Sequence, residues 1–164
     1  MRNVTRSMIA SVLLAGGLSL VLVPARALLA QSDPAVGTWK LNAAKSKYNP
    51  GPPPRSQTLT ISAAGNGVTV MSRGTDGAGK PLATDYTVAF DGKDVPVKGS
   101  PSYDATSAKR VDANTTELTR RKGGKIVQTS RRVVSADGKT MTITTTGVNE
   151  NGDRISNVGV FEKQ

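Results

Sequence analysis

The chain of 164 residues carries a formal net charge of +10 and contains neither histidine nor cysteine. That length favours a single domain, and the missing residue types exclude disulfides, thiolate metal sites and catalysis by a histidine base or a cysteine nucleophile. A strongly basic protein suits anionic partners such as lipid, glycan or nucleic acid. Six aromatic residues in the whole chain provide no stacking platform for single-stranded nucleic acid, so we expect no nucleic-acid partner.

The first 30 residues have the order of a secretory signal peptide. Arg2 and Arg6 lie in a short basic segment, residues 8–23 are apolar or small, and Ala27 and Ala30 provide small residues for cleavage. The apolar run is shorter than the ~20 residues of a membrane span. We therefore expect a signal peptide over residues 1–30, a periplasmic or secreted product, and no stable membrane span after cleavage. Cleavage after Ala27 is the alternative to cleavage after Ala30, and an uncleaved N-terminal anchor is the less favoured hypothesis.

Residues 31–164 divide into short segments of alternating pattern, separated by turns rich in Gly and Asp, and they show no helical period. The predicted strands are Val36–Leu41, Gln57–Ser62, Val68–Arg73, Leu82–Phe90, Val95–Lys98, Ala105–Val111, Thr116–Lys122, Ile126–Val134, Thr140–Thr146 and Arg154–Glu162. Short strands at even spacing are typical of an antiparallel sandwich or barrel, and hairpins in sequence favour an up-and-down meander. We expect one all-β domain over residues 31–164, a closed or partly open barrel of about 8–10 strands whose closure removes exposed edges.

Prolines modify this strand pattern at two places. Pro96 places its short strand at an edge or a bulge. The segment Asn42–Arg55 contains three consecutive prolines, which cannot donate to a strand ladder. We interpret it as a stiff loop across the end of the barrel, with a lid as the alternative.

The two ends of the domain resemble the calycins, the group of lipocalins and fatty-acid-binding proteins. The opening Gly37-Thr38-Trp39 and the ending Val160-Phe161-Glu162-Lys163 carry the resemblance. It implies that Gly37 and Trp39 form a structural plug at the closed end of a barrel, and that the interior holds a small ligand. Two features differ from fatty-acid-binding proteins: Gly159-Val160-Phe161 replaces their Arg-x-Tyr clamp, and the proline-rich segment replaces their two helices. The chain also resembles small exported bacterial proteins of uncharacterised type.

Catalytic chemistry has no visible basis in this sequence. Most carboxylates lie in turns, where Asp usually bonds its own backbone. The pair Asp91 and Asp94 lacks the spacing of a glycosidase dyad or a calcium loop. The segment Asn149–Asp153 is interpreted as a turn for the same reason. We therefore expect no enzyme, no metal site and no cofactor.

A cluster of basic residues cannot lie entirely on the outer face of the barrel if its strands alternate regularly. Eight of them fall in three consecutive predicted strands and their turns: Lys109, Arg110, Arg120, Arg121, Lys122, Lys125, Arg131 and Arg132. Side chains alternate along a strand, so each Arg-Arg doublet sends one arginine to each face. Leu118 marks the inner face of its strand and places Arg120 inside, whereas the next strand fits two frames equally well. An interior arginine is costly unless it is paired or hydrated.

Two hypotheses about function follow from that cluster. In the first, a hollow barrel holds a small apolar or amphipathic, anionic ligand against Tyr86, Phe90, Arg120, Arg132, Ile143 and Phe161. In the second, the arginines form a solvated basic face that docks on anionic envelope lipid or a partner protein, and there is no interior ligand. We expect a monomer in either case. The sequence does not identify the ligand.

Overall fold

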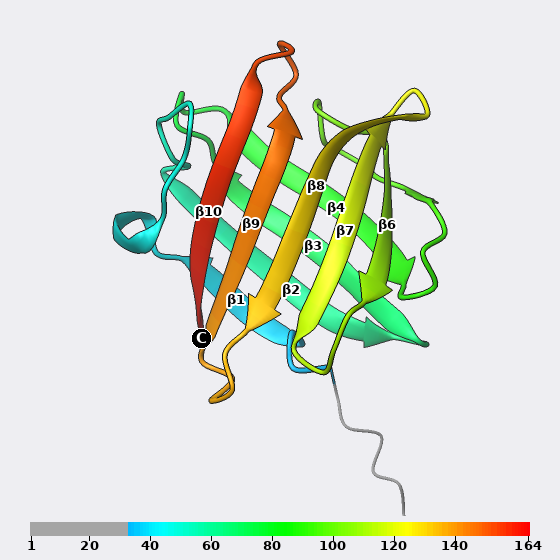
Figure 1. Ribbon diagram of the computed structural model, residues 1–164. Coiled ribbons are helices and arrows are strands. Elements are labelled where there is room, and N and C mark those ends of the chain that lie inside the picture. Colours follow the sequence, from blue (N-terminus) through cyan, green and yellow to red (C-terminus); the bar gives the residue numbers. More distant parts are fainter. Residues whose placement is uncertain (1–32) are drawn as a thin grey trace, which may run out of the picture. The chain divides into compact units, whose positions relative to one another are not determined.

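Residues 33–164 form ten antiparallel strands that follow one another along the chain (Figure 1). In this computed structural model they are β1 (Gly37–Leu41), β2 (Ser56–Ala64), β3 (Gly67–Thr75), β4 (Pro81–Ala89), β5 (Val95–Pro96), β6 (Ala105–Arg110), β7 (Thr115–Lys122), β8 (Lys125–Val134), β9 (Thr140–Val148) and β10 (Arg154–Lys163). The structure describes residues 33–164. The predicted signal peptide and its cleavage sites lie outside the described residues and stay predictions.

The strands pair in a single sheet that curls into a nearly closed barrel. Their order is β4-β3-β2-β1-β10-β9-β8-β7-β6-β5, so every hairpin neighbour in the sequence but one is a neighbour in the sheet. The remaining seam runs between β4 and the β5–β6 segment. There Asp85 and Lys98 exchange two backbone hydrogen bonds of 3.0 Å, and Gly92 donates one of 2.9 Å to Ala108. The predicted all-β, up-and-down barrel is therefore confirmed, and β5 with Pro96 is an edge strand of this sheet as expected.

Alternation of side chains decides which residues face the barrel interior. In β8 the residues Gln128, Ser130, Arg132 and Val134 are buried, whereas Arg131 and its alternate neighbours are exposed. Arg120 and Arg121 of β7 pair with Gln128 and Ile126, so Val127 is an extra residue that forms a bulge near the start of β8. The bulge explains why Ile126, although it belongs to the same sequence frame, is 60% exposed.

A hydrophobic core fills the barrel around β1. Trp39 and Met141 have no exposed surface, and Val68, Val88 and Phe161 are also buried. The Trp39 indole N–H donates a 2.8 Å hydrogen bond to the backbone carbonyl of Ala35, which satisfies its one polar group. The side chain of Lys163 lies over the indole ring, with Nζ 5.1 Å from its centroid.

Gly37 is required beside this tryptophan. Its φ of +139° lies outside the range that other residues favour, and a Cβ built there would lie 2.7 Å from Cε of Lys163. The Gly-x-Trp opening therefore combines a strained backbone position with a buried ring. This placement is compatible with the predicted structural role of Gly37 and Trp39.

The proline-rich segment crosses the opposite end of the barrel. After the short 3-10 helix η1 (Ala43–Lys45), the chain is joined to β10 where Asn49 accepts a 2.8 Å hydrogen bond from the Ser156 N–H. It then packs on the β3–β4 turn, because a Cβ on Gly77 would lie 2.4 Å from Cγ of Pro52. These contacts support the interpretation of the proline-rich segment as a stiff loop across the end of the barrel. Within residues 33–164 no helix has the length and apolar character needed to cross a membrane.

Candidate functional site

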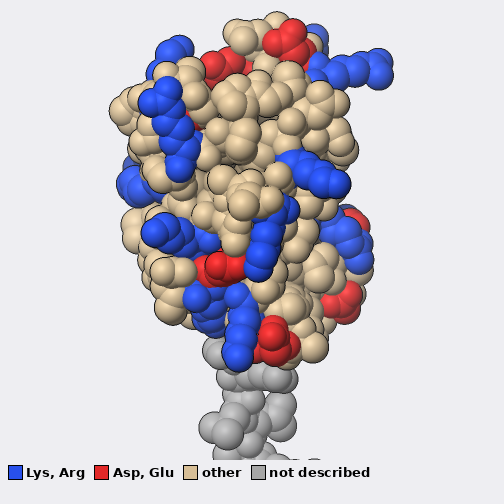
Figure 2. All heavy atoms as spheres, turned by 90° about the vertical axis from the view of Figure 1, so that its left-hand side faces the viewer, with Lys and Arg blue, Asp and Glu red and all other residues tan. Residues whose placement is uncertain are grey.

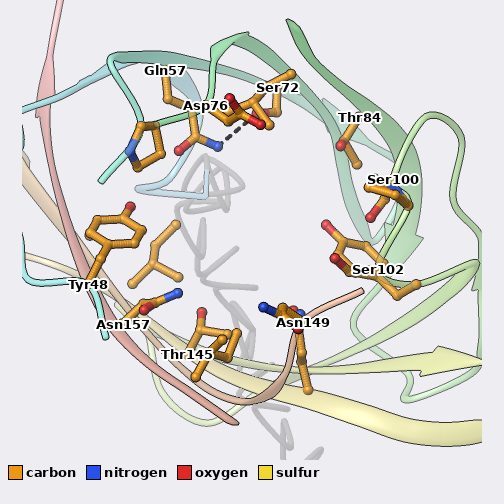
Figure 3. Close-up of a pocket in the computed structure, with 18 of the residues that line it drawn as sticks. Tyr48, Gln57, Ser72, Asp76, Thr84, Ser100, Ser102, Thr145, Asn149 and Asn157 are labelled. Carbon is orange, nitrogen blue, oxygen red and sulfur yellow. Dashed lines mark hydrogen bonds between the residues drawn. The ribbon is translucent and has the colours of Figure 1, made fainter. Parts of the chain in front are cut away.

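The barrel is hollow at the end that the proline-rich segment crosses. A cavity of about 620 Å³ lies there. Its opening, called the mouth below, is formed by four segments: residues 50–54, the β3–β4 turn, residues 99–102 between β5 and β6, and the β9–β10 turn. Figure 3 shows side chains from these segments and from the strands below them arranged around the open centre.

Apolar side chains form the deeper part of the wall. Leu59 and Ile61 of β2, Val70 of β3, Ile143 of β9 and Phe161 of β10 line the cavity and also belong to, or pack on, the hydrophobic core. Each is the inward residue of an alternating strand, so the same pattern that builds the core also makes an apolar binding wall. This wall suits the apolar part of a ligand.

Arg120 of β7 lies in the wall and faces the cavity. Its Nη1 donates hydrogen bonds of 3.2 Å to Oε1 of Gln128 and 2.9 Å to Oγ of Ser130. Its guanidinium carbon lies 4.9 Å from the centroid of the Tyr103 ring, a cation–π contact. Its Nε is buried and has no hydrogen-bond partner among the described residues. The partners that Arg120 does have are all uncharged.

Arg132 of β8 is more deeply buried, with 4% of its surface exposed. Its Nη2 donates a 3.3 Å hydrogen bond to Oγ1 of Thr116. Burial lowers the pKa of the Arg132 guanidinium, against the charges of Tyr86 and Asp33, which raise it. The cost of burying this cation is therefore offset by one weak hydrogen bond and by the charge of Asp33, whose own ion pair is with Arg110.

Tyr86 of β4 lies close to both guanidinium groups. Burial raises the pKa of the Tyr86 phenol above its ordinary value, and the positive charges of Arg120 and Arg132 oppose that rise. The phenol thus stays a neutral donor at physiological pH. Tyr86, Arg120 and Arg132, called the Arg–Tyr–Arg cluster below, bring two cations and one hydroxyl to the same cavity from three strands.

Neither arginine of the cluster has a carboxylate within ion-pair distance; the charge of Asp33, which acts on Arg132, is itself paired with Arg110. The ion pairs among residues 33–164 join Lys45 to Glu162, Arg73 to Asp85, Lys93 to Asp91, Arg110 to Asp33, Arg121 to Asp94 and Arg131 to Glu117. Neither interior arginine takes part in any of them. Two unpaired cations with hydrogen-bond donors in a partly apolar cavity are the arrangement expected of an anion site.

Most of the residues predicted for ligand binding line this one cavity. They are Tyr86, Arg120, Arg132, Ile143 and Phe161. Phe90 does not line this cavity. It has the same inward phase as Tyr86, but it follows the other end of β4, where the guanidinium carbon of Arg110 lies 4.0 Å from its ring centroid.

The basic face required by the second hypothesis can include only part of the predicted cluster of basic residues. Arg120 and Arg132 face the interior, while the surface arginines Arg121 and Arg131 are paired with carboxylates at 2.5 and 3.1 Å. On the face around η1 and β10, Lys and Arg side chains are scattered among acidic and uncharged ones (Figure 2). Two arginines of the predicted basic cluster therefore do not contribute to an outer basic face.

Several cavity residues were missed by the sequence reasoning. Gln128 is in phase with Arg132 and could have been found once the frame of β8 was known. Tyr103, Ser100 and Ser102 belong to an irregular loop, where no periodicity indicates direction. Tyr48 reaches the cavity from the proline-rich segment, and burial raises the pKa of its phenol. Residues 33–164 contain no group of acidic residues placed to hold a metal ion.

Comparison with known proteins finds similarity in structure alone. No protein-family model matches the chain, and no curated protein matches its sequence. Among solved structures, the chain is similar to a zebrafish ileal bile acid-binding protein complexed with cholic acid, with a TM-score of 0.49 and 12% identity, over 80% of this chain and 99% of that one. What this chain binds is therefore inferred below from its own cavity.

Proposed function

We propose that this chain is an exported binding protein that holds a small amphipathic anion inside its barrel. The anionic group would lie at the Arg–Tyr–Arg cluster, and the apolar part would lie against Leu59, Ile61, Ile143 and Phe161. The size of the cavity supports a small molecule, since pockets of roughly 300–1,000 Å³ are typical of such ligands. Its walls combine apolar surface with a few convergent polar groups, which is also typical.

The observation that carries the proposal is the pair of interior arginines, neither of which forms an ion pair with a carboxylate among the described residues. A buried cation without a counter-charge is destabilising, and proteins usually pair it or remove it. Here Arg132 is 4% exposed and its described partner is a threonine hydroxyl, and Nε of Arg120 has no partner. An anion that enters the cavity would supply both the missing charge and the missing acceptors.

The last strand contributes no charged side chain to the cavity wall. In β10 the cavity wall is formed by Gly159, where a Cβ would lie 3.0 Å from Cε2 of Phe161 and 3.1 Å from the hydroxyl of Tyr48. A larger residue at that position would therefore require the side chain of Phe161 or Tyr48 to shift. β7 and β8 carry Arg120 and Arg132 instead.

Three further statements belong to the proposal. The protein acts by binding and catalyses no reaction, since the whole chain lacks His and Cys. It needs no cofactor and works as a monomer. Its place of action is the periplasm or the extracellular space, as the basic, apolar and small order of residues 1–30 suggests.

Matched ligands and matched variants test the anion site. Binding of dodecanoate, dodecyl sulfate and uncharged dodecanol is measured by displacement of a fluorescent probe from the wild type, Arg120→Met, Arg132→Met and the outward control Arg131→Met. A charge-assisted hydrogen bond contributes about 1.5–3 kcal/mol, so each interior variant should weaken anion binding about tenfold or more. Dodecanol binding should change little in any variant.

Two results would contradict the proposal. One is equal affinity of the wild type for dodecanoate and dodecanol. The other is a loss of dodecanoate binding in Arg131→Met as large as that in Arg132→Met, because Arg131 lies on the outer face and forms an ion pair with Glu117.

A further inference from the structure

The mouth of the cavity carries a second group of polar side chains, distinct from the two arginines. Five of them, called the mouth ring below, are half-buried and line the opening: Gln57 of β2, Thr84 of β4, Ser100 and Ser102 of the loop between β5 and β6, and Asn157 of β10. Figure 3 shows them around the open centre from opposite sides of the barrel. None of the five is charged.

Hydroxyl groups elsewhere in this barrel pair with one another across neighbouring strands. Thr69 and Thr87 do so on the outer face at 2.8 Å, and Ser130 and Thr145 do so inside at 2.8 Å. In contrast, the hydroxyls of Thr84, Ser100 and Ser102 have no hydrogen bond to any residue that the structure describes, although all three line one cavity. Their hydrogen-bonding capacity is therefore directed at whatever fills the mouth.

The two amides of the ring keep one free end each. Nε2 of Gln57 donates a 2.9 Å hydrogen bond to Oγ of Ser72, which leaves its carbonyl oxygen as an acceptor. Oδ1 of Asn157 accepts a 3.0 Å hydrogen bond from the Asn49 N–H, which leaves its NH₂ group as a donor. The mouth ring therefore offers donors and acceptors together, and it offers no net charge.

The loop with both serines is held in place by its two ends. At one end Lys98 exchanges two backbone hydrogen bonds with Asp85, and at the other the Asp104 N–H donates a 2.9 Å bond to the Arg121 carbonyl. Gly99 has a φ of +79° and lies so close to β4 that a Cβ would be 1.9 Å from the Ala83 carbonyl oxygen. Ser100 and Ser102 are thus fixed over the cavity, and preorganised groups bind at a lower entropic cost.

We propose that the mouth ring is a subsite for uncharged hydroxyl groups of the ligand. This inference rests on the proposed function, since it places the anionic group at the Arg–Tyr–Arg cluster and the hydroxyl groups at the mouth. A hydroxyl both donates and accepts, and so it matches a ring of hydroxyls and amides. The five ring members carry no charge, and the charged residues other than the two arginines that line the same cavity, Asp76, Lys80 and Glu150, lie in the β3–β4 and β9–β10 turns. The ligand is then a hydroxylated amphipathic acid rather than a plain fatty acid.

Pairs of ligands that differ by one hydroxyl test this subsite. Decanoate, dodecanoate and hexadecanoate are each compared with the acid that carries a hydroxyl on its last carbon, so that the hydroxyl reaches three different heights. Calorimetric titration is carried out with the wild type, the double variant Thr84→Val/Ser102→Ala and the control Thr87→Val, whose hydroxyl lies on the outer face of the same strand. Circular dichroism verifies that each variant is folded.

In at least one pair, the hydroxylated acid should bind the wild type about fivefold tighter or more, as one good neutral hydrogen bond allows. The double variant should lose this preference and keep its affinity for the plain acid, and Thr87→Val should behave like the wild type. The subsite is refuted if plain acids bind but no pair shows a preference, or if the double variant retains it. If none of the acids binds the wild type, the proposed function fails together with the subsite.

Discussion

Replacing Arg132 by methionine should make the empty protein more stable. Arg132 is 4% exposed. Among the described residues it donates one side-chain hydrogen bond, of 3.3 Å to Thr116, and no carboxylate forms an ion pair with it. Apolar replacement of buried charged groups stabilises proteins by about 1–4 kcal/mol in favourable cases. Loss of the hydrogen bond to Thr116 lowers the unfolding free energy by about 1 kcal/mol. The expected net gain in unfolding free energy is therefore about 0–3 kcal/mol.

Urea denaturation of wild type and Arg132→Met at pH 7, with Arg131→Met as the control, measures this difference. Dodecanoate should shift this difference in favour of the wild type, since a ligand at 100 times the wild-type Kd adds about 2.7 kcal/mol to the wild type and only about 1.4 kcal/mol to a variant that binds it ten times more weakly. The opposite finding, a loss of more than about 1 kcal/mol in the ligand-free variant, would mean that the interior already satisfies the Arg132 charge. The reasoning for an anion site would then lose its main support.

Three further outcomes are expected. Trp39→Ala should lower the unfolding free energy by about 3–5 kcal/mol, as for other large core truncations; a loss under about 1 kcal/mol in a urea melt would contradict the structural role of this buried ring. Stability should be nearly constant from about pH 5 to 9, because the chain has no histidine. Hydrogen bonds from basic side chains lower the pKa of Asp85 and Glu162, so the folded state binds fewer protons than the unfolded state, and stability falls as the pH drops below about 4. Burial raises the pKa of Tyr86 above its ordinary 10.0, so stability also falls above that pH; a marked change between pH 6 and 8 in thermal melts would contradict this profile. The intact mass of the exported protein should correspond to cleavage after Ala30, or alternatively three residues earlier, and a mass that retains the first 27 residues would refute the signal peptide.

The strands could be predicted because turn residues and alternation are local signals. β4 was expected at Leu82–Phe90 and is found at Pro81–Ala89, and β10 was expected at Arg154–Glu162 and ends one residue later. Gly and Asp in the turns mark the ends of such strands for steric reasons that the sequence alone reveals. The fold class followed from these elements and their even spacing.

The site was predicted less completely, since periodicity gives a side chain's face but not its height in the barrel. Tyr86 and Phe90 have the same phase along β4 and the residue after it, yet Tyr86 lines the cavity, whereas Phe90 packs under Arg110. The frame of β8 was undecided because both frames contain apolar residues and one arginine each. Pairing with β9 and the bulge at Val127 decide it, and both depend on contacts far apart in the chain.

The most direct test of the anion site is a crystal structure of the protein with 12-bromododecanoate. Anomalous scattering from bromine locates the tail, and the electron density locates the carboxylate. The account predicts a carboxylate within about 2.7–3.2 Å of guanidinium nitrogens of Arg120 and Arg132. A ligand bound outside the barrel, or a carboxylate that contacts neither arginine, would contradict it.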